Sequence, residues 1–94
     1  MKTTKVAGKT SEHKVLVYAL STCVWCKQTK KLLKDKGVEY EYVDVDLCSK
    51  EDSEEIHKRI MSMGGRLVFP TVIIDEKVLV NGHHEDQLQR VLGL

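Results

Sequence analysis

Two cysteines, Cys23 and Cys26, lie between a segment that predicts a strand and a segment that predicts a helix. Residues 15–20 form a short apolar run rich in β-branched side chains, which is typical of a buried strand. Residues 24–36 have the pattern of an amphipathic helix and are followed by Gly37, a common helix end. The Cys-x-x-Cys motif is therefore predicted to lie on a strand-to-helix turn, with Cys23 at or just before the first helical turn.

This position favours redox chemistry at the two sulfurs. The first amides of a helix have no partners within the helix, and the peptide dipoles place roughly half a positive charge there. A thiolate, the reactive form of cysteine, is stabilised at such a site. We predict Cys23 and Cys26 as the catalytic residues. Cys23 is expected to be largely thiolate at neutral pH and to attack a disulfide of another molecule, whereas Cys26 stays protonated and resolves the mixed disulfide.

Other interpretations of the cysteine pair are half of a zinc site and two structural thiols. A zinc site of this type usually needs a second pair of ligands at matched spacing. Cys48 stands alone and is expected to be a partly buried thiol. His83 and His84 are adjacent on a predicted turn, an arrangement that makes it difficult for both to face one metal. We therefore predict no metal ligands.

Composition limits the class of protein. A chain of 94 residues predicts one domain, with residues 13–94 folded and residues 1–12 a mobile tail. The net charge of +1 gives no reason to expect binding to nucleic acid or a membrane. Three cysteines, an odd number, suit a reducing compartment. No apolar run has the length of a membrane span or a signal peptide, so we expect a cytoplasmic protein. We also expect a monomer.

The remaining patterns complete an alternation of strands and helices. The second strand should run parallel to the first, because a helix connects them. Ser49 or Asp52 is placed to cap the second helix, and Asp75-Glu76-Lys77 is short enough for a hairpin turn. After the first strand and helix, we expect a strand at 38–45, a helix at 50–63, strands at 67–75 and 78–80, and a helix at 84–92.

This order, with the Cys-x-x-Cys motif after the first strand and Pro70 near the start of the third, resembles the glutaredoxin branch of the thioredoxin superfamily. The resemblance implies an α/β, thioredoxin-like fold in which three helices flank a four-stranded mixed sheet. It also implies that Pro70 is cis, packs beside the cysteines and presents the backbone of Phe69 to an extended substrate. It covers residues 14–94 and depends most on residues 18–27, 68–71 and 82–88.

Several residues near the motif are expected to contact the substrate. Trp25 lies within the turn and offers a contact surface, and Lys27 adds a positive charge beside the thiols. The resemblance adds Arg66, Phe69, Pro70 and His84 to this set. The sequence also departs from the family, because Val24-Trp25 replaces the frequent Pro-Tyr, Leu20 replaces a frequent lysine, and His84 stands where an acidic residue often caps the last helix.

The resemblance implies a thiol–disulfide oxidoreductase of the glutaredoxin type, an electron carrier in cell redox homeostasis. Its substrates would be disulfide-containing proteins or small disulfides, and no cofactor would stay bound. The electron donor is open between glutathione, another thiol and a flavoprotein resembling thioredoxin reductase. The alternative function is an iron–sulfur cluster or metal carrier, in which Cys23 from each of two chains and two external thiols hold the cluster.

Overall fold

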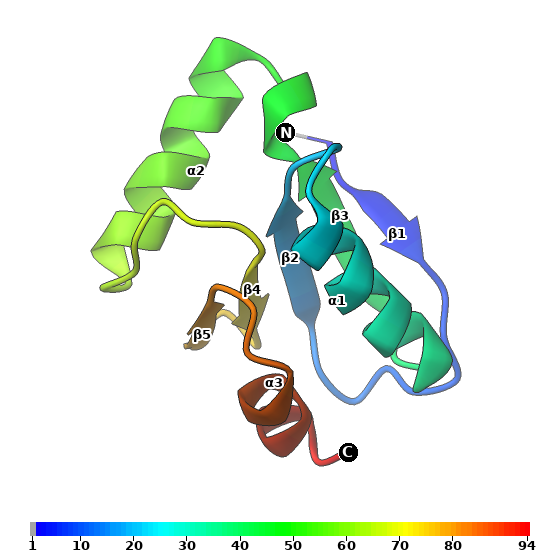
Figure 1. The fold of residues 1–94 in the computed structure, drawn as a ribbon. Coiled ribbons are helices and arrows are strands. Elements are labelled where there is room, and N and C mark those ends of the chain that lie inside the picture. The colour runs from blue at the N-terminus through cyan, green and yellow to red at the C-terminus, as the bar shows by residue number, and fades with distance from the viewer. Residues whose placement is uncertain (1) are drawn as a thin grey trace.

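The strand that precedes the cysteines is the central strand of a mixed sheet covered by helices on both faces (Figure 1). The computed structural model describes residues 2–94. Within this range the chain forms, in order, β1 (Thr4–Val6), β2 (Val15–Ala19), α1 (Val24–Asp35), β3 (Tyr40–Asp44), a short 3-10 helix η1 (Val45–Leu47), α2 (Lys50–Ser62), β4 (Thr71–Ile74), β5 (Val78–Asn81) and α3 (Glu85–Leu92).

The strands lie in the order β1-β3-β2-β4-β5. β2 and β3 are parallel, as the connecting helix predicts, and β4 runs antiparallel to both β2 and β5. Asp75, Glu76 and Lys77 connect the paired residues Ile74 and Val78, so they form the predicted hairpin turn. Asp75 and Glu76 have positive φ angles of 54° and 60°, and the Lys77 amide donates to the Ile74 carbonyl at 3.1 Å. The α/β, thioredoxin-like architecture is therefore confirmed.

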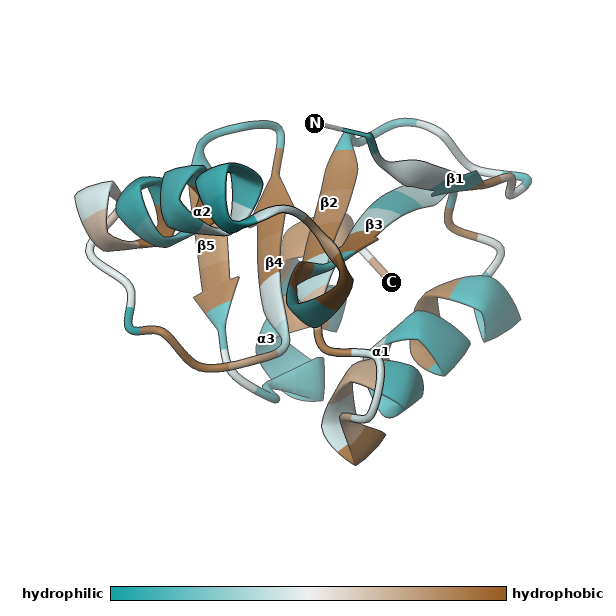
Figure 2. Ribbon diagram, turned by 90° about the horizontal axis from the view of Figure 1, so that it is seen from above, coloured by the Kyte–Doolittle hydropathy of each residue, from teal (hydrophilic) through white to brown (hydrophobic). Residues whose placement is uncertain are grey.

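Alternating side chains of β2 divide the core between the two faces of the sheet. Val15, Val17 and Ala19 pack with the buried residues of α1 and α3, which include Cys26. Tyr18 packs on the other face with α2. Figure 2 shows this arrangement from above, with the hydrophobic strands β2 and β4 between α2 on one side and α1 and α3 on the other.

β1 corrects two expectations. The sheet has five strands rather than four, and β1, which lies within the expected mobile tail, pairs antiparallel with β3. Thr4 and Lys5 face solvent, so this edge strand has no apolar alternation to reveal it in the sequence. A Cβ on Gly8 would lie 2.6 Å from the backbone nitrogen of Glu39, so the close approach of the two backbones requires glycine. Met1 lies outside the described residues.

The third predicted strand is shorter than expected. It begins at Thr71 rather than at residue 67, and residues 67–70 form a loop that leads to a cis peptide bond between Phe69 and Pro70. Leu67 and Val68 are exposed in this loop. Their apolar side chains produced the pattern of a strand, but the two residues precede the sheet in the loop that leads to Phe69 and Pro70.

Candidate active site

The Cys-x-x-Cys motif lies where β2 leads into α1, as predicted. Cys23 is the N-cap residue of α1, and its Sγ accepts a hydrogen bond from the backbone amide of Cys26 at 3.1 Å. The amide of Cys23 donates to the carbonyl of Leu20, also at 3.1 Å. An amide donor at a helix start stabilises a thiolate more than a thiol. This geometry favours Cys23 as the attacking sulfur.

The two cysteines differ sharply in exposure. Cys26 is 0% exposed, whereas Cys23 is half-buried, and both are free thiols. Burial raises the pKa of Cys26 from 9.0 to about 12, and the hydrogen bond and negative charge of Cys23 add to the effect. The buried Cys26 is therefore a protonated thiol at neutral pH, as the sequence predicts, and an external disulfide has no direct access to it.

The loop before β4 closes the site beside Cys23. The carbonyl oxygen of Phe69 lies 3.9 Å from the Sγ of Cys23, and the bond from Phe69 to the buried Pro70 is cis. The hydroxyl of Thr71 donates to the carbonyl of Val68 at 2.7 Å and fixes the turn of this loop. The predicted pair Phe69 and Pro70 therefore lies against the cysteines.

Asn81, at the end of β5, holds the same loop and is a site residue that sequence reasoning missed. Its side-chain oxygen accepts from the Arg66 amide at 2.7 Å, and its nitrogen donates to the Arg66 carbonyl at 2.9 Å and to the Thr71 hydroxyl at 2.8 Å. These bonds fix the backbone of Arg66, which is otherwise exposed. An asparagine before a glycine is an ordinary turn signal, so the sequence does not reveal this role.

Trp25 stacks on His83, a second residue that the sequence did not place in the site. The two ring centroids are 4.6 Å apart. The Nε2 of His83 lies 3.7 Å from the carboxylate of Glu85, and its buried Nδ1 has no hydrogen-bond partner within residues 2–94. The stack joins the Cys-x-x-Cys turn to the loop before α3. In the sequence, only the position of His83 next to Gly82 could have suggested that His83 belongs to the site.

Exposed apolar side chains flank the half-buried Cys23. A Cβ on Gly82 would lie 3.9 Å from the side chain of Val68, so the loop before α3 contacts the loop before β4. Exposed apolar side chains that gather around a reactive residue are candidates for contact with another molecule. We call this surface the apolar rim; it consists of Val24, Trp25, Leu67 and Val68.

The charged residues predicted for substrate binding lie at the periphery. Lys27 is exposed in the first turn of α1, and His84 is the N-cap residue of α3 but makes no capping hydrogen bond through its side chain. Within residues 2–94, the hydrogen bonds of the Cys23 sulfur are with the Cys26 amide and the Phe69 carbonyl. Lys27, Arg66 and His84 therefore do not contact the sulfur directly.

Asp46 holds the start of the cysteine turn at Ser21, a role that the sequence did not predict. Its carboxylate accepts hydrogen bonds from the amide of Ser21 at 2.9 Å and from the Ser21 hydroxyl at 2.5 Å. The side-chain bond from Ser21, followed by the backbone bond, lowers the pKa of Asp46 below its usual value. Residue 46 follows β3 and residue 21 follows β2, so only the parallel pairing of these strands brings them together.

The part of the chain that the structure describes, residues 2–94, lacks two other kinds of feature. The described side chains include no group of three or more histidines, cysteines or carboxylates placed to hold a metal ion. In the same range, every helix is too short or too polar to span a lipid bilayer. The partly accessible Cys23, the buried Cys26 and the loop at Phe69 form the candidate active site.

Sequence comparison identifies the class of protein to which this fold and site belong. The family model described as Glutaredoxin matches residues 15–79. Glutaredoxin 1 of Rickettsia conorii is 35% identical over 63 residues, which are 67% of this chain and 59% of that protein. The match thus spans about three fifths of the length of this curated relative. The chain belongs to the glutaredoxin family.

Solved structures extend the similarity to the whole chain. A glutaredoxin from Methanosarcina mazei is 38% identical, covers 100% of this chain and 90% of its own, and has a TM-score of 0.85. The methanoredoxin of Methanosarcina acetivorans is 42% identical over 86% of this chain and 85% of its own, with a TM-score of 0.75. These similarities agree with the thioredoxin-like architecture described above.

Proposed function

We propose that this protein is a dithiol glutaredoxin, which reduces disulfides through Cys23 and Cys26. The Cys23 thiolate attacks one sulfur of a substrate disulfide, a new sulfur–sulfur bond forms, and the other substrate sulfur leaves as a thiolate that takes a proton from water. Cys26 then loses its proton and attacks Cys23, releasing the second substrate thiolate, which is protonated in turn. The substrate gains two electrons, the protein ends as a Cys23–Cys26 disulfide, and no bound cofactor is needed.

One observation carries this proposal, namely the different environments of two sulfurs on a single helical turn. Cys23 accepts the Cys26 amide at the helix start and is partly accessible, whereas Cys26 is buried and protonated. Attack requires an accessible thiolate, and resolution requires a nearby thiol that does not compete for the substrate. The accessible sulfur at the helix start and the buried sulfur one turn further along support these two roles.

The apolar rim supports a protein as the substrate. Trp25 and Val24 are 55% and 63% exposed beside Cys23, and an aromatic residue of this kind is a frequent anchor of protein interfaces. The charged residues Lys27, Arg66 and His84 lie outside contact with the sulfur. We therefore propose that apolar contacts with a disulfide-containing protein contribute more to substrate binding than ionic contacts with a small anionic disulfide.

The proposed reaction also requires an electron donor. A second thiol, such as glutathione, or a flavoprotein reductase must return two electrons to the oxidised Cys23–Cys26 pair. Supplying one disulfide substrate with glutathione and its reductase, and separately with a thioredoxin reductase, distinguishes these donors. The more effective donor is the one that sustains turnover at the lower concentration of this protein.

Cysteine variants test the proposed mechanism. We expect Cys23→Ser to abolish disulfide reduction, because the serine hydroxyl is not ionised at neutral pH. Cys26→Ser should trap a mixed disulfide between Cys23 and the substrate, visible by mass spectrometry without reductant. Cys48→Ser is the matched control, because the Cys48 thiol donates to the Val45 carbonyl at 3.0 Å and packs with the α2 side of the core, away from Cys26. Full activity of Cys23→Ser would overturn the assignment.

A further inference from the structure

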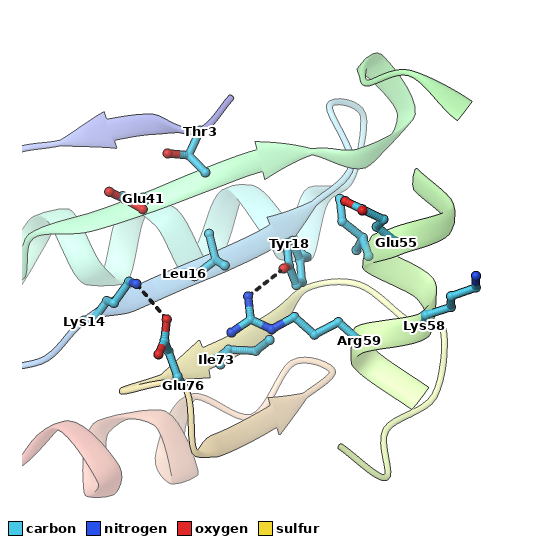
Figure 3. A pocket seen from close by; sticks show the side chains of 11 residues that line it. Thr3, Lys14, Leu16, Tyr18, Glu41, Glu55, Lys58, Arg59, Ile73 and Glu76 are labelled. Atoms are coloured by element: carbon cyan, nitrogen blue, oxygen red, sulfur yellow. Dashed lines mark hydrogen bonds and ion pairs between the residues drawn. The ribbon is translucent and has the colours of Figure 1, made fainter. Parts of the chain in front are cut away.

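A cavity of about 550 Å³ lies between α2 and the sheet (Figure 3). Its lining includes Leu16 and Tyr18 of β2, whereas Val17 packs on the other face with Cys26. Because side chains of a strand alternate between faces, the cavity lies on the opposite side of the sheet from the cysteines. Its volume is within the range of about 300–1,000 Å³ that is typical of small-molecule sites. The proposed redox reaction makes no use of it.

The cavity has an apolar base, which we call its floor, and an ion pair at one end. Leu16, Ile56 and Ile73 provide an apolar surface. At one end, the Nζ of Lys14 lies 2.8 Å from the carboxylate of Glu76, so these two charges already compensate each other (Figure 3). A bound molecule would meet an apolar floor bounded by a neutral ion pair at this end.

Arg59 of α2 is one of several further charged residues that line the cavity, together with Glu41, Glu55 and the exposed Lys58. Its guanidinium reaches over Ile73 into the cavity and donates one hydrogen bond to the hydroxyl of the buried Tyr18 at 3.3 Å (Figure 3). The ion pairs found within residues 2–94 do not include Arg59. A guanidinium has five N–H donors, and its planar edge matches a carboxylate. Arg59 is therefore available to bind an anion above an apolar floor.

We infer that this cavity binds a small monocarboxylate with an apolar body. The carboxylate would pair with Arg59, and the apolar part would lie over Leu16 and Ile73. Glu41 and Glu55 stand at the rim without ion pairs among the described residues. They would repel a second negative charge, so a dicarboxylate of the same length should bind less well.

Titration of the ¹⁵N-labelled full chain with octanoate tests this inference. We expect saturable changes in the amide spectrum centred on β2, β4 and α2. In the wild-type protein, suberate, the dicarboxylate of the same length, and octylammonium, its cationic counterpart, should bind at least tenfold more weakly. These comparisons need no substitution, so they decide the matter even if a variant fails to fold.

Arg59→Gln should weaken octanoate binding at least tenfold, because charge-assisted hydrogen bonds to the carboxylate are lost. Arg90→Gln is the matched control, since Arg90 lies on α3, which packs on the opposite face of the sheet. The Arg90→Gln protein should bind octanoate as tightly as the wild type does. The inference is overturned if shifts are absent or centre on Trp25, if octylammonium or suberate binds as tightly as octanoate, or if the two arginine variants behave alike.

Discussion

The raised pKa of Cys26 predicts how strongly the two active-site sulfurs differ in reactivity. The thiolate fraction at a given pH well below the pKa falls tenfold for each unit by which the pKa rises. A pKa of about 12 in place of 9.0 therefore lowers the thiolate fraction of Cys26 at pH 7 about a thousandfold, from roughly one in a hundred to one in a hundred thousand. Burial slows alkylation further, since the sulfur is 0% exposed. Of the two active-site sulfurs, Cys23 should therefore account for essentially all alkylation at neutral pH.

The same reasoning predicts the effect of removing Cys23. Burial is the largest cause of the raised pKa of Cys26, and the hydrogen bond and charge of Cys23 are smaller causes. Cys23→Ser removes the sulfur that provides these two smaller causes and leaves the burial in place. The pKa of Cys26 should then fall below about 12 but stay above 9.0, so its alkylation should become faster at every pH between 7 and 11 while remaining slower than that of an unfolded cysteine.

Alkylation by iodoacetamide of the fully reduced protein measures both effects. Each cysteine is followed by mass spectrometry of the digested protein between pH 5 and pH 11, and Cys48 provides an internal comparison. In the wild type, the rate at Cys26 should rise about tenfold for each unit of pH over this range. The reasoning is refuted if Cys26 reacts within tenfold of Cys23 at pH 7, or if Cys23→Ser slows the reaction of Cys26.

Two further predictions concern the apolar rim and the core. Trp25→Ala should raise the KM for the reduction of a protein disulfide such as insulin about 5- to 30-fold, as loss of an aromatic interface anchor does. The KM for a small aromatic disulfide should change much less, and equal effects on both substrates would contradict a protein-docking role. Leu33→Ala, at a position 0% exposed, should lower the free energy of unfolding by about 2–5 kcal/mol in urea titration. Leu47→Ala, at a position 71% exposed, should change it by less than about 0.5 kcal/mol. Similar losses in the two variants would refute the placement of α1 on the sheet.

Local signals in the sequence were sufficient for the centre of the molecule. The apolar run before Cys23 predicted β2, and the motif itself predicted the start of α1, where Cys23 is the N-cap residue. Ser49 caps α2 as expected, since its hydroxyl accepts from the amide of Asp52 at 3.1 Å. Each of these features depends on residues within a few positions of one another, so the chain pattern contains the information. The cis bond at Pro70 followed from family resemblance rather than from the pattern.

The missed features depend on contacts between distant parts of the chain. β1 is an exposed edge strand that backbone pairing with β3 holds in place, and its own residues carry no apolar period. Asn81 bonds to the loop before β4, His83 stacks on Trp25, and Asp46 bonds to Ser21. Their partners are known only once the order of strands is known. Asn81, His83 and Asp46 are polar and lie at or just beyond the ends of strands, where the sequence pattern is weak.

The alternation of β2 explains how one small sheet supplies two independent surfaces. Val17 and Ala19 support the face that carries Cys26, whereas Leu16 and Tyr18 line the cavity on the other face. β2 nevertheless pairs with β3 and β4 along its length, so the backbone is shared by both faces. A charge change at Arg59 alters side-chain contacts on the cavity face alone, because the strand backbone does not depend on it. Binding at the cavity and reactivity at the cysteines are therefore separable properties, and loss of one leaves the case for the other intact.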